Sequence, residues 1–236
     1  MTRRWLFAVV AGVAFSMLSD RPLPALSGGG EYDPEIIPAD FVDEIDNPYF
    51  TMVPGTTFIY EKETEEGLET VVVQVTHTKK VIMGVTCTQI RDTVRLDGEL
   101  VEDTLDWFAQ HKDGTVWYFG EFSTDFENGE VSGHEGSWEA GVDGAKPGII
   151  MLAHPKQGRS YRQEYYPGVA EDMGKVLSLD EEVEIEIGEF EECLKTREWT
   201  PLERGVREHK YYAPGVGLVL VVDLETGDEL DLVGIE

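Results

Sequence analysis

The chain has 236 residues, of which 47 are acidic and 19 are basic, so its formal net charge at pH 7 is −28. A surface this negative repels phosphate backbones and anionic lipid headgroups, which argues against nucleic acids and membrane surfaces as partners. The hydrophobic content of 41% and the aromatic content of 10% exclude a disordered acidic tail, and the length suits one β domain.

Residues 1–27 are predicted to be an export signal. Arg3 and Arg4 give a positive start, and residues 5–18 form an apolar run of 14 residues, which is short for a membrane span. Small side chains place the cleavage after Ser27, and an uncleaved anchor is the alternative. The segment carries three arginines and one aspartate, so its removal leaves 46 acidic and 16 basic residues, a net charge of −30. We expect the mature chain in the periplasm or outside the cell, without membrane insertion.

Residues 28–50 are predicted to be an acidic lead-in arm, followed by a single β domain over residues 51–236. The arm begins with three consecutive glycines, which is typical of a linker. Its apolar side chains Ile36, Ile37 and Phe41 provide the means to pack against the domain.

The domain is expected to be mainly β. Residues 70–76 and 85–94 are rich in β-branched side chains and predict strands. Turn dipeptides then recur at intervals of 16, 15 and 15 residues, at Asp97-Gly98, Asp113-Gly114, Asn128-Gly129 and Asp143-Gly144. Such dipeptides favour tight hairpins because both central residues take positive φ. Long strands between tight turns predict an antiparallel meander that curls into a curved sheet, a half-barrel or a barrel.

Two segments depart from this pattern. Residues 144–158 combine Pro, Gly and a short apolar run, and are expected to cross over between the two halves of the domain. Residues 169–179 carry apolar side chains at helical spacing, and are interpreted as either one short helix or a long loop.

The two halves of the domain resemble each other, over about residues 53–145 and 156–236. Each half has a glycine-led opening, a cysteine that precedes a strand, and an aromatic pair followed by alanine. The corresponding positions are Gly55 and Gly158, Cys87 and Cys193, and Trp107-Phe108-Ala109 and Tyr211-Tyr212-Ala213. Their offsets are 103, 106 and 104 residues. This order and spacing predict a duplication with pseudo-twofold symmetry; the alternative is two hairpin-rich sheets with common turn chemistry.

Cys87 and Cys193 leave two alternatives open. In an exported chain they could form a disulfide, provided that their Cα atoms lie within about 7 Å of each other. Otherwise they are two buried thiols.

Aromatic side chains are the first candidates for a binding surface. Trp107, Trp117 and Tyr118 lie in neighbouring predicted strands, and the stretch 115–122 carries aromatic residues on both alternating faces. One face must pack in the core, and the other is a candidate apolar binding face. Core packing is the commoner role for any one of these residues.

A second candidate group mixes charge with aromatic rings. Arg162, Glu164 and Tyr166 would share one side of a strand, with Tyr165 on the other. This group could line a polar pocket, although an Arg–Glu cross-strand pair is the plainer interpretation. His154, on the predicted crossover, is the histidine most open to a functional role.

Motifs for catalysis and metal binding are weak. Asp113-Gly114 with Glu121 resembles only part of a calcium loop, and a β-turn explains it better. No nucleophile elbow, phosphate-binding glycine loop or zinc spacing occurs. We therefore predict no cofactor, leave weak Ca²⁺ binding open, and favour a protein that is not an enzyme.

Several stretches resemble a family of exported bacterial proteins of unassigned function. They are residues 46–50 with 53–58, 136–144, 161–165 and 211–217. More distantly, the long-stranded pattern is similar to the curled-sheet, LolA/LolB-like carriers of the periplasm. The first resemblance implies no activity, and the second concerns architecture alone.

The leading hypothesis is an exported binding protein that holds an apolar or amphiphilic ligand, or a protein partner, on a concave aromatic face. One alternative is an acidic surface or structural protein that responds to Ca²⁺. Another is a hydrolase of unrecognised type, with His154 acting near Glu164.

Overall fold

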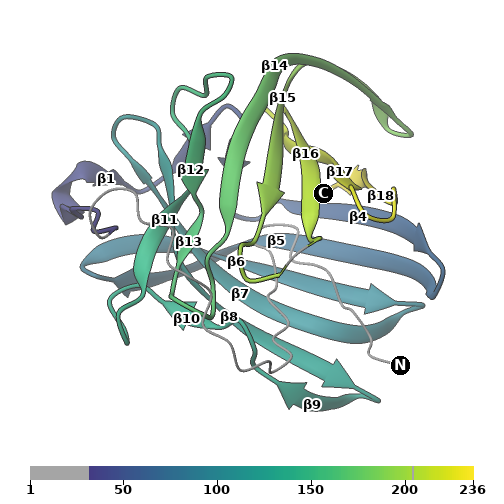
Figure 1. The fold of residues 1–236 in the computed structure, drawn as a ribbon, viewed down its shortest axis with the longest axis horizontal. Helices are drawn as coiled ribbons and strands as arrows, with labels where there is room; N and C mark the ends of the chain where they lie inside the picture. The colour runs from purple at the N-terminus through teal and green to yellow at the C-terminus, as the bar shows by residue number, and fades with distance from the viewer. Residues whose placement is uncertain (1–31, 204) are drawn as a thin grey trace.

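The computed structural model describes residues 32–203 and 205–236, so the predicted export signal and residues 28–31 lie outside the described residues. The fold is nearly all antiparallel β, with 66% of residues in strands and one large sheet nearly closed into a barrel (Figure 1). The prediction of a curled antiparallel meander is confirmed. Within the described residues, no helix is long and apolar enough to cross a membrane.

In the described residues the first regular element is a 3-10 turn, η1 (Pro38–Asp40), and the elements that follow it are all strands. In chain order these are β1 (Phe41–Val42), β2 (Ile45–Asn47), β3 (Phe50–Met52), β4 (Thr57–Thr64), β5 (Gly67–Ile82), β6 (Val85–Leu96), β7 (Glu99–His111), β8 (Val116–Glu127), β9 (Glu130–Gly133), β10 (Trp138–Glu139), β11 (Lys146–Met151), β12 (Ser160–Arg162), β13 (Glu164–Tyr165), β14 (Met173–Ile185), β15 (Gly188–Trp199), β16 (Arg207–Ala213), β17 (Gly217–Asp223) and β18 (Glu229–Ile235).

The chain itself joins the two ends of the nearly closed sheet. Thirteen of the described strands follow one path, β12-β14-β15-β16-β17-β18-β4-β5-β6-β7-β8-β11-β13. The end strands β12 and β13 are successive segments of the chain, separated by Gln163 alone. At this point Gly148 of β11 lies so close to Gln163 that an added Cβ would stand 1.9 Å from the Gln163 carbonyl oxygen. Glycine therefore allows the backbones to meet where the sheet returns on itself.

Three of the four predicted turn dipeptides have the backbone expected of tight hairpins. Asp97-Gly98, Asn128-Gly129 and Asp143-Gly144 each place both residues at positive φ. In Asp113-Gly114 only the glycine does so, and the chain turns there through a longer β7–β8 connection. Met83-Gly84, which the sequence did not single out, takes the same backbone between β5 and β6.

Two sequence interpretations need correction. Residues 169–179 form neither a helix nor a long loop, because most of them belong to β14, where Gly174 and Val176 are buried and Met173 and Lys175 are half-buried. That is the period of two expected of a strand, which the apolar spacing concealed. The predicted crossover at residues 144–158 is partly strand β11, which pairs with β8. Only the second half of the crossover is a connection, and it leads to β12.

The two halves contribute their strands in matching order. β4 to β8 are consecutive neighbours in the sheet, and β12, β14, β15, β16 and β17 are consecutive neighbours in the other half. Cys87 and Cys193 lie in β6 and β15, and the two aromatic pairs lie in β7 and β16. The duplication itself stays a prediction.

The lead-in arm lies against the barrel in its described part. β1 pairs with β7, and Phe41 packs edge-on against Phe119 at 5.5 Å between ring centroids. Ile36 also packs against the core, whereas Ile37 is 47% exposed. The end of the arm and the first residues of the predicted domain form the hairpin of β2 and β3, which pair only with each other.

Candidate functional site

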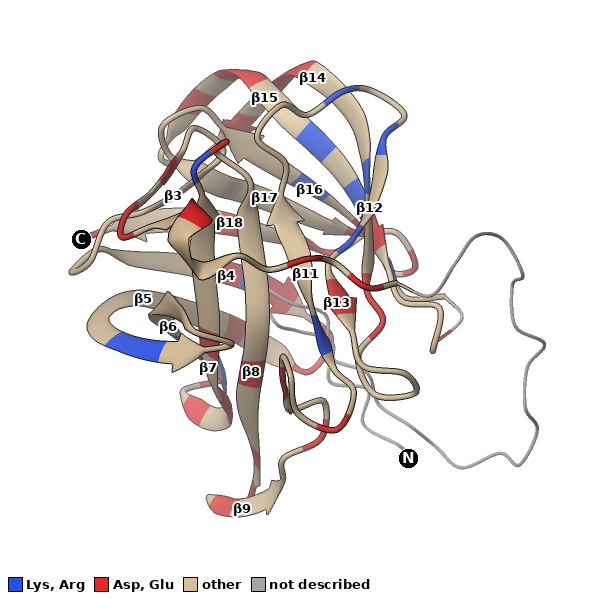
Figure 2. Ribbon diagram, turned by 90° about the vertical axis from the view of Figure 1, so that its left-hand side faces the viewer, with Lys and Arg blue, Asp and Glu red and all other residues tan. Residues whose placement is uncertain are grey.

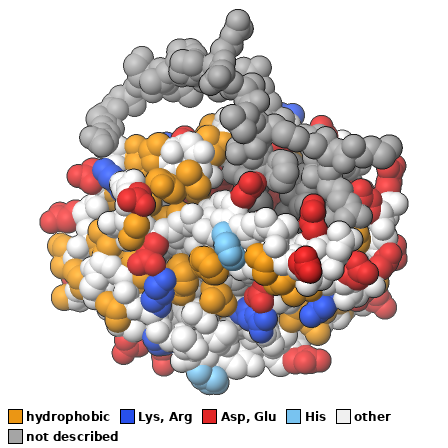
Figure 3. Space-filling view, turned by 90° about the horizontal axis from the view of Figure 1, so that it is seen from below, with side chains coloured by type: hydrophobic (Ala, Val, Ile, Leu, Met, Phe, Trp, Pro, Cys, Tyr) orange, Lys and Arg blue, Asp and Glu red, His pale blue; other side chains and the backbone are white. Residues whose placement is uncertain are grey.

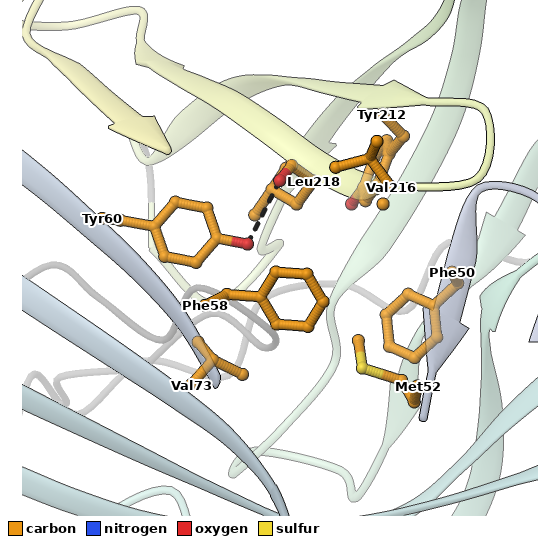
Figure 4. A pocket seen from close by; sticks show the side chains of 9 residues that line it. Phe50, Met52, Phe58, Tyr60, Val73, Tyr212, Val216 and Leu218 are labelled. Atoms are coloured by element: carbon orange, nitrogen blue, oxygen red, sulfur yellow. Dashed lines mark hydrogen bonds between the residues drawn. The ribbon is translucent and has the colours of Figure 1, made fainter. Parts of the chain in front are cut away.

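A small apolar cavity lies between the β2–β3 hairpin and the strands β4, β5, β16 and β17 (Figure 4). Its volume is about 20 Å³, enough for one water-sized molecule. It is lined by Phe50, Met52, Phe58, Tyr60, Val73, Tyr212, Val216, Gly217 and Leu218. Figure 4 shows Phe50 and Met52 on one side of the cavity, opposite Phe58 and Tyr60. Three distant parts of the chain therefore converge on one apolar space.

The β2–β3 hairpin covers this cavity and is held by a few polar contacts. The side-chain amide of Asn47 donates to the carbonyl oxygens of Gly114 at 2.8 Å and Leu152 at 3.2 Å. The Gln110 side-chain oxygen accepts the backbone N–H of Asp46 at 3.0 Å and of Asn47 at 2.9 Å. No other strand extends this hairpin. It is also held by the Gly215 backbone N–H, which donates to the Pro48 carbonyl oxygen at 2.7 Å, and by the buried side chains of Ile45 and Phe50.

Beside the apolar part, the structure buries a group of carboxyl side chains, which we call the carboxyl cluster: Asp106, Glu121, Glu164 and Asp172. Alternation in β7 and a bulge in β8 turn Asp106 and Glu121 to the same side, next to Tyr118. The Tyr118 hydroxyl lies 2.6 Å from Asp106 Oδ1 and 3.1 Å from Glu121 Oε2. One hydroxyl proton serves only one of these oxygens at a time, so a proton on Glu121 would complete the second hydrogen bond.

The least satisfied member of the cluster is Glu164. In the described part of the chain, neither of its oxygens has a hydrogen-bond partner, and its side chain is completely buried. The indole N–H of Trp138 lies near this carboxyl and lowers its pKa without completing a hydrogen bond. Burial, together with Asp172, Glu121 and Asp106, raises the pKa of Glu164 well above its usual range.

The other members also favour the protonated state. Burial raises the pKa of Asp106 to about 7, although the Tyr118 hydroxyl opposes the shift. Burial raises the pKa of Asp172 to about 7, and raises that of Glu121 well above its usual range. The cluster is thus a proton-binding site near neutral pH.

A second buried group contains a cation. Lys210 Nζ lies 3.1 Å from Glu198 Oε2 and 3.6 Å from Glu208 Oε2. Glu198 Oε1 also accepts from the Thr196 hydroxyl at 2.9 Å and from the Tyr212 hydroxyl at 3.0 Å. The two neighbouring carboxylates raise the pKa of Lys210 against the opposing effect of burial. We call these residues the Lys210 group.

Tyr212 connects the apolar cavity to the Lys210 group. Its ring lines the cavity, and its hydroxyl donates to Glu198. The Lys210 group adjoins the carboxyl cluster, because the Lys210 charge acts on the Asp172 carboxyl. Tyr212 therefore lies between the apolar cavity and the buried polar side chains of the Lys210 group.

The predicted aromatic residues pack in the core or at its edge and do not line the cavity. Tyr118 is fully buried and stacks on Phe108 at 4.5 Å, next to the carboxyl cluster. Trp107 is 5% exposed, and Lys80 Nζ lies 3.3 Å from its ring centroid. Trp117 is half-buried at the edge of the core. Both faces of β8 carry aromatic residues because the arm covers the outer face.

The structure brings together only some of the residues in the second candidate group, which is Arg162, Glu164, Tyr165 and Tyr166. The Arg162 guanidinium lies 4.9 Å from the Tyr165 ring centroid, and Tyr166 is half-buried against the core. Glu164 faces the carboxyl cluster and forms no ion pair with Arg162 within the described residues. The expected Arg–Glu cross-strand pair is therefore wrong.

His154 is exposed, between β11 and β12. It has no hydrogen bond or ion pair with the buried Glu164 in the described residues, so the structure gives no support to a hydrolase that uses both.

Cys87 and Cys193 are free and buried, so of the two alternatives the disulfide is wrong. Between their strands, β6 and β15, the sheet places β5, β4, β18, β17 and β16. Burial raises the pKa of the Cys87 thiol to about 12 and that of Cys193 to about 11.

Weak Ca²⁺ binding stays a prediction. In residues 32–203 and 205–236, no group of three or more His, Cys, Asp or Glu side chains is placed to hold a metal ion. Ca²⁺ needs about six to eight oxygen ligands around one point.

No protein-family model, no curated protein and no solved structure matches the chain. The resemblance to exported bacterial proteins and the architectural likeness to periplasmic carriers therefore stay predictions.

Proposed function

We propose that this protein binds an apolar or amphiphilic small molecule in the cavity beneath the β2–β3 hairpin. The observation that carries the proposal is the convergence of apolar side chains from β3, β4, β5 and the β16–β17 turn on one space. The present volume of about 20 Å³ is too small for such a ligand, so binding requires the hairpin to move. Phe50 and Met52 then act as a plug that the ligand replaces.

The construction of the hairpin supports this role. Its two strands have three residues each and belong to a sheet of their own. Displacing it breaks the hydrogen bonds of Asn47 and Gln110 and the one from the Gly215 N–H to the Pro48 carbonyl oxygen, and it exposes the buried Ile45 and Phe50, but it leaves the barrel ladders intact. A bound apolar ligand has to replace the burial that these two side chains lose.

The polar interior supports an amphiphilic rather than a purely apolar ligand. Tyr212 offers its ring to the cavity, while its hydroxyl reaches the Lys210 group. A ligand with a hydrogen-bonding end could therefore place its apolar part among Phe58, Val73 and Leu218, and its polar end toward Tyr212. With the predicted export signal, we place this activity in the periplasm or outside the cell.

The test is a titration of the purified chain with the neutral fluorescent probe N-phenyl-1-naphthylamine, compared between the wild type and Val216→Trp. The larger side chain fills the cavity, so we expect the probe to bind at least about tenfold more weakly, the loss of about 1.4 kcal/mol of binding free energy. Val131→Trp is the matched control, because Val131 is 58% exposed on β9.

The variant Asn47→Ala adds a kinetic test to the same experiment. Without its hydrogen bonds to Gly114 and Leu152, the hairpin opens more easily, so we expect faster probe association in stopped-flow fluorescence. Equal probe affinity in wild type, Val216→Trp and Val131→Trp would refute the proposal.

A further inference from the structure

β11 and β13 share the shortest ladder along the path of the large sheet. It has two residue pairs, Lys146 with Tyr165 and Pro147 with Glu164, whereas β7 and β8 share eight. Pro147 has no backbone N–H and therefore donates no hydrogen bond to β13. Figure 2 shows β11 and β13 next to each other at this ladder, which we call the seam.

The seam attaches a short segment, residues 163–172, which we call the flap. The flap has hydrogen bonds of its own: the Gln163 N–H donates to the Asp172 carbonyl oxygen at 2.7 Å, and the Tyr166 N–H donates to the Ala170 carbonyl oxygen at 2.6 Å. These bonds do not involve β11. The turn of the flap therefore need not unfold when the flap separates from β11.

The carboxyl cluster lies on both sides of the seam. Glu164 and Asp172 belong to the flap, whereas Asp106 and Glu121 lie on β7 and β8, on the side of β11. Burial and then Asp172 raise the pKa of Glu164, and Glu121 and Asp106 add to this across the seam. Because like charges repel strongly in a low-dielectric interior, ionised carboxyls push the flap away from β7 and β8. Protonated carboxyls exert no such force.

Neighbouring groups do not cancel this repulsion. Besides burial, those that act on the cluster from adjacent strands and loops are the acids Glu102, Glu198 and Glu208, the cation Lys210, and the hydrogen-bond donors Tyr118, Trp138 and Thr200. Lys210 acts on Asp172, where Glu198 and Glu208 oppose it. Its charge is already shared by those two glutamates, at 3.1 Å and 3.6 Å. Protons or separation are therefore the means that relieve the repulsion.

A strap on the outer side holds the seam. The Tyr32 hydroxyl donates to the Pro147 carbonyl oxygen of β11 at 2.9 Å, and the Tyr32 ring centroid lies 5.1 Å from that of Tyr165 on β13. The Arg162 guanidinium lies 5.5 Å from the first ring centroid and 4.9 Å from the second. Burial raises the pKa of Tyr32 to about 12, so its hydroxyl keeps its proton through the neutral range. The strap therefore holds the seam equally at neutral and at mildly alkaline pH.

We propose that the seam is a pH-controlled gate into the barrel, at which the flap separates from β11 when the carboxyl cluster loses its protons. Separation exposes Glu164 to water and leaves the long ladders in place, as local opening at the least stable part of a fold does. The gate does not depend on a ligand beneath the β2–β3 hairpin, because the flap contributes no residue to that cavity.

Amide hydrogen exchange with mass spectrometry tests the gate at about pH 6 and about pH 8.5, with exchange times scaled to the intrinsic rate. We expect the protection of peptides over residues 145–151 and 161–167 to fall at least about tenfold between these pH values. In Glu164→Gln the group that faces both Asp106 and Glu121 is neutral, so the fall should shrink to less than about threefold. Glu130→Gln removes an exposed acid on β9 and is the matched control, which should keep the tenfold fall.

Two further measurements separate the gate from general effects of charge. Acidic side chains lie over much of the surface, as Figure 3 shows for the face seen from below, so repulsion at the surface also grows with pH. Peptides from β5 and β6 record this effect, and their protection should change less than about threefold. Tyr32→Ala removes the strap and should lower protection at the seam by a similar factor at both pH values.

Four results would overturn the inference. They are equal wild-type protection of the seam at both pH values, an equal fall in β5 and β6, a fall in Glu164→Gln as large as in the wild type, and unchanged protection in Tyr32→Ala. Circular dichroism confirms that each variant is folded. Asp106→Asn, which neutralises the other side of the seam, takes the place of Glu164→Gln if that variant does not fold.

Discussion

Buried carboxyl groups inside the barrel have two kinds of surroundings. In the Lys210 group, Glu198 and Glu208 lie within 4 Å of one ammonium group. In the carboxyl cluster, Asp106, Glu121 and Glu164 have no lysine or arginine within that distance in the described residues. The first region balances buried charge with an opposite charge, and the second removes it by binding protons. The same residue type thus carries charge in one region and a proton in the other, according to its neighbours.

Removing the positive charge of Lys210 should give the largest change in the free energy of unfolding. Lys210→Met leaves Glu198 and Glu208 without their counter-charge in a buried site. We expect the free energy of unfolding at pH 7.5 to fall by about 3–5 kcal/mol, measured by urea denaturation. Lys175→Met on the outer face is the control and should change it by less than about 0.5 kcal/mol. A loss below about 1 kcal/mol for Lys210→Met would show that the two regions do not differ in the way described.

Acidification should reveal the carboxyl cluster. The pKa of Asp106 is about 7 in the folded chain and about 4 when unfolded, so between these values the folded state binds more protons. The free energy of unfolding therefore rises as the pH falls from about 8 to about 5, and this contribution is lost as the pH rises through 7. Asp172 contributes with the same sign.

The measurement is urea denaturation across this pH range for the wild type and Asp106→Asn. Surface carboxylates repel one another and act in the same direction, so the difference in slope between the two proteins is the test. We expect the variant to lose roughly 1–2 kcal/mol of the pH-dependent gain. Parallel curves would place the titrating protons elsewhere.

Neutralising one glutamate in each region should change stability in opposite directions. Glu164→Gln removes the cost of protonating, in the folded state, a carboxyl that is ionised in the unfolded chain, and we expect a gain of roughly 1–3 kcal/mol at pH 8. Glu198→Gln removes the carboxylate that pairs with Lys210 and accepts from Tyr212, and we expect a loss of roughly 2–4 kcal/mol. Changes of the same sign in both variants would contradict the distinction between the regions.

The smallest expected effect concerns the two thiols. Because Cys87 and Cys193 are free and lie in separate strands, dithiothreitol should shift the melting temperature by less than about 1 °C. Thiol titration without reductant should find two reactive groups after unfolding, and almost none while the raised pKa values hold. One thiol or none in the unfolded chain would mean that they are oxidised.

The strands and tight turns could be predicted because their signals are local. Residues 70–76 and 85–94 lie within β5 and β6, and Asp97-Gly98 forms the turn that follows. The first part of β14, residues 173–179, was missed because its apolar positions fit a helical period as well as a period of two, and only pairing with β15 decides between them.

The candidate site could not be predicted in the same way. Glu102, Thr104 and Asp106 alternate along β7 as the exposed face of a strand would, yet barrel closure turns them inward. The cavity needs Phe50 and Phe58 together with Leu218, and no local pattern connects two such distant segments. Glu164 was identified from its neighbours in sequence, but the cluster that it faces depends on the pairing of β13 with β11.

Native mass spectrometry of the chain purified from its own host tests the proposed binding site most directly. We predict a small molecule, below about 1 kDa, that remains with the folded wild type and with the Val131→Trp control, and that is absent from Val216→Trp. If the wild type carries no bound molecule, or if Val216→Trp retains it in the same amount, the cavity beneath the β2–β3 hairpin is not a ligand site.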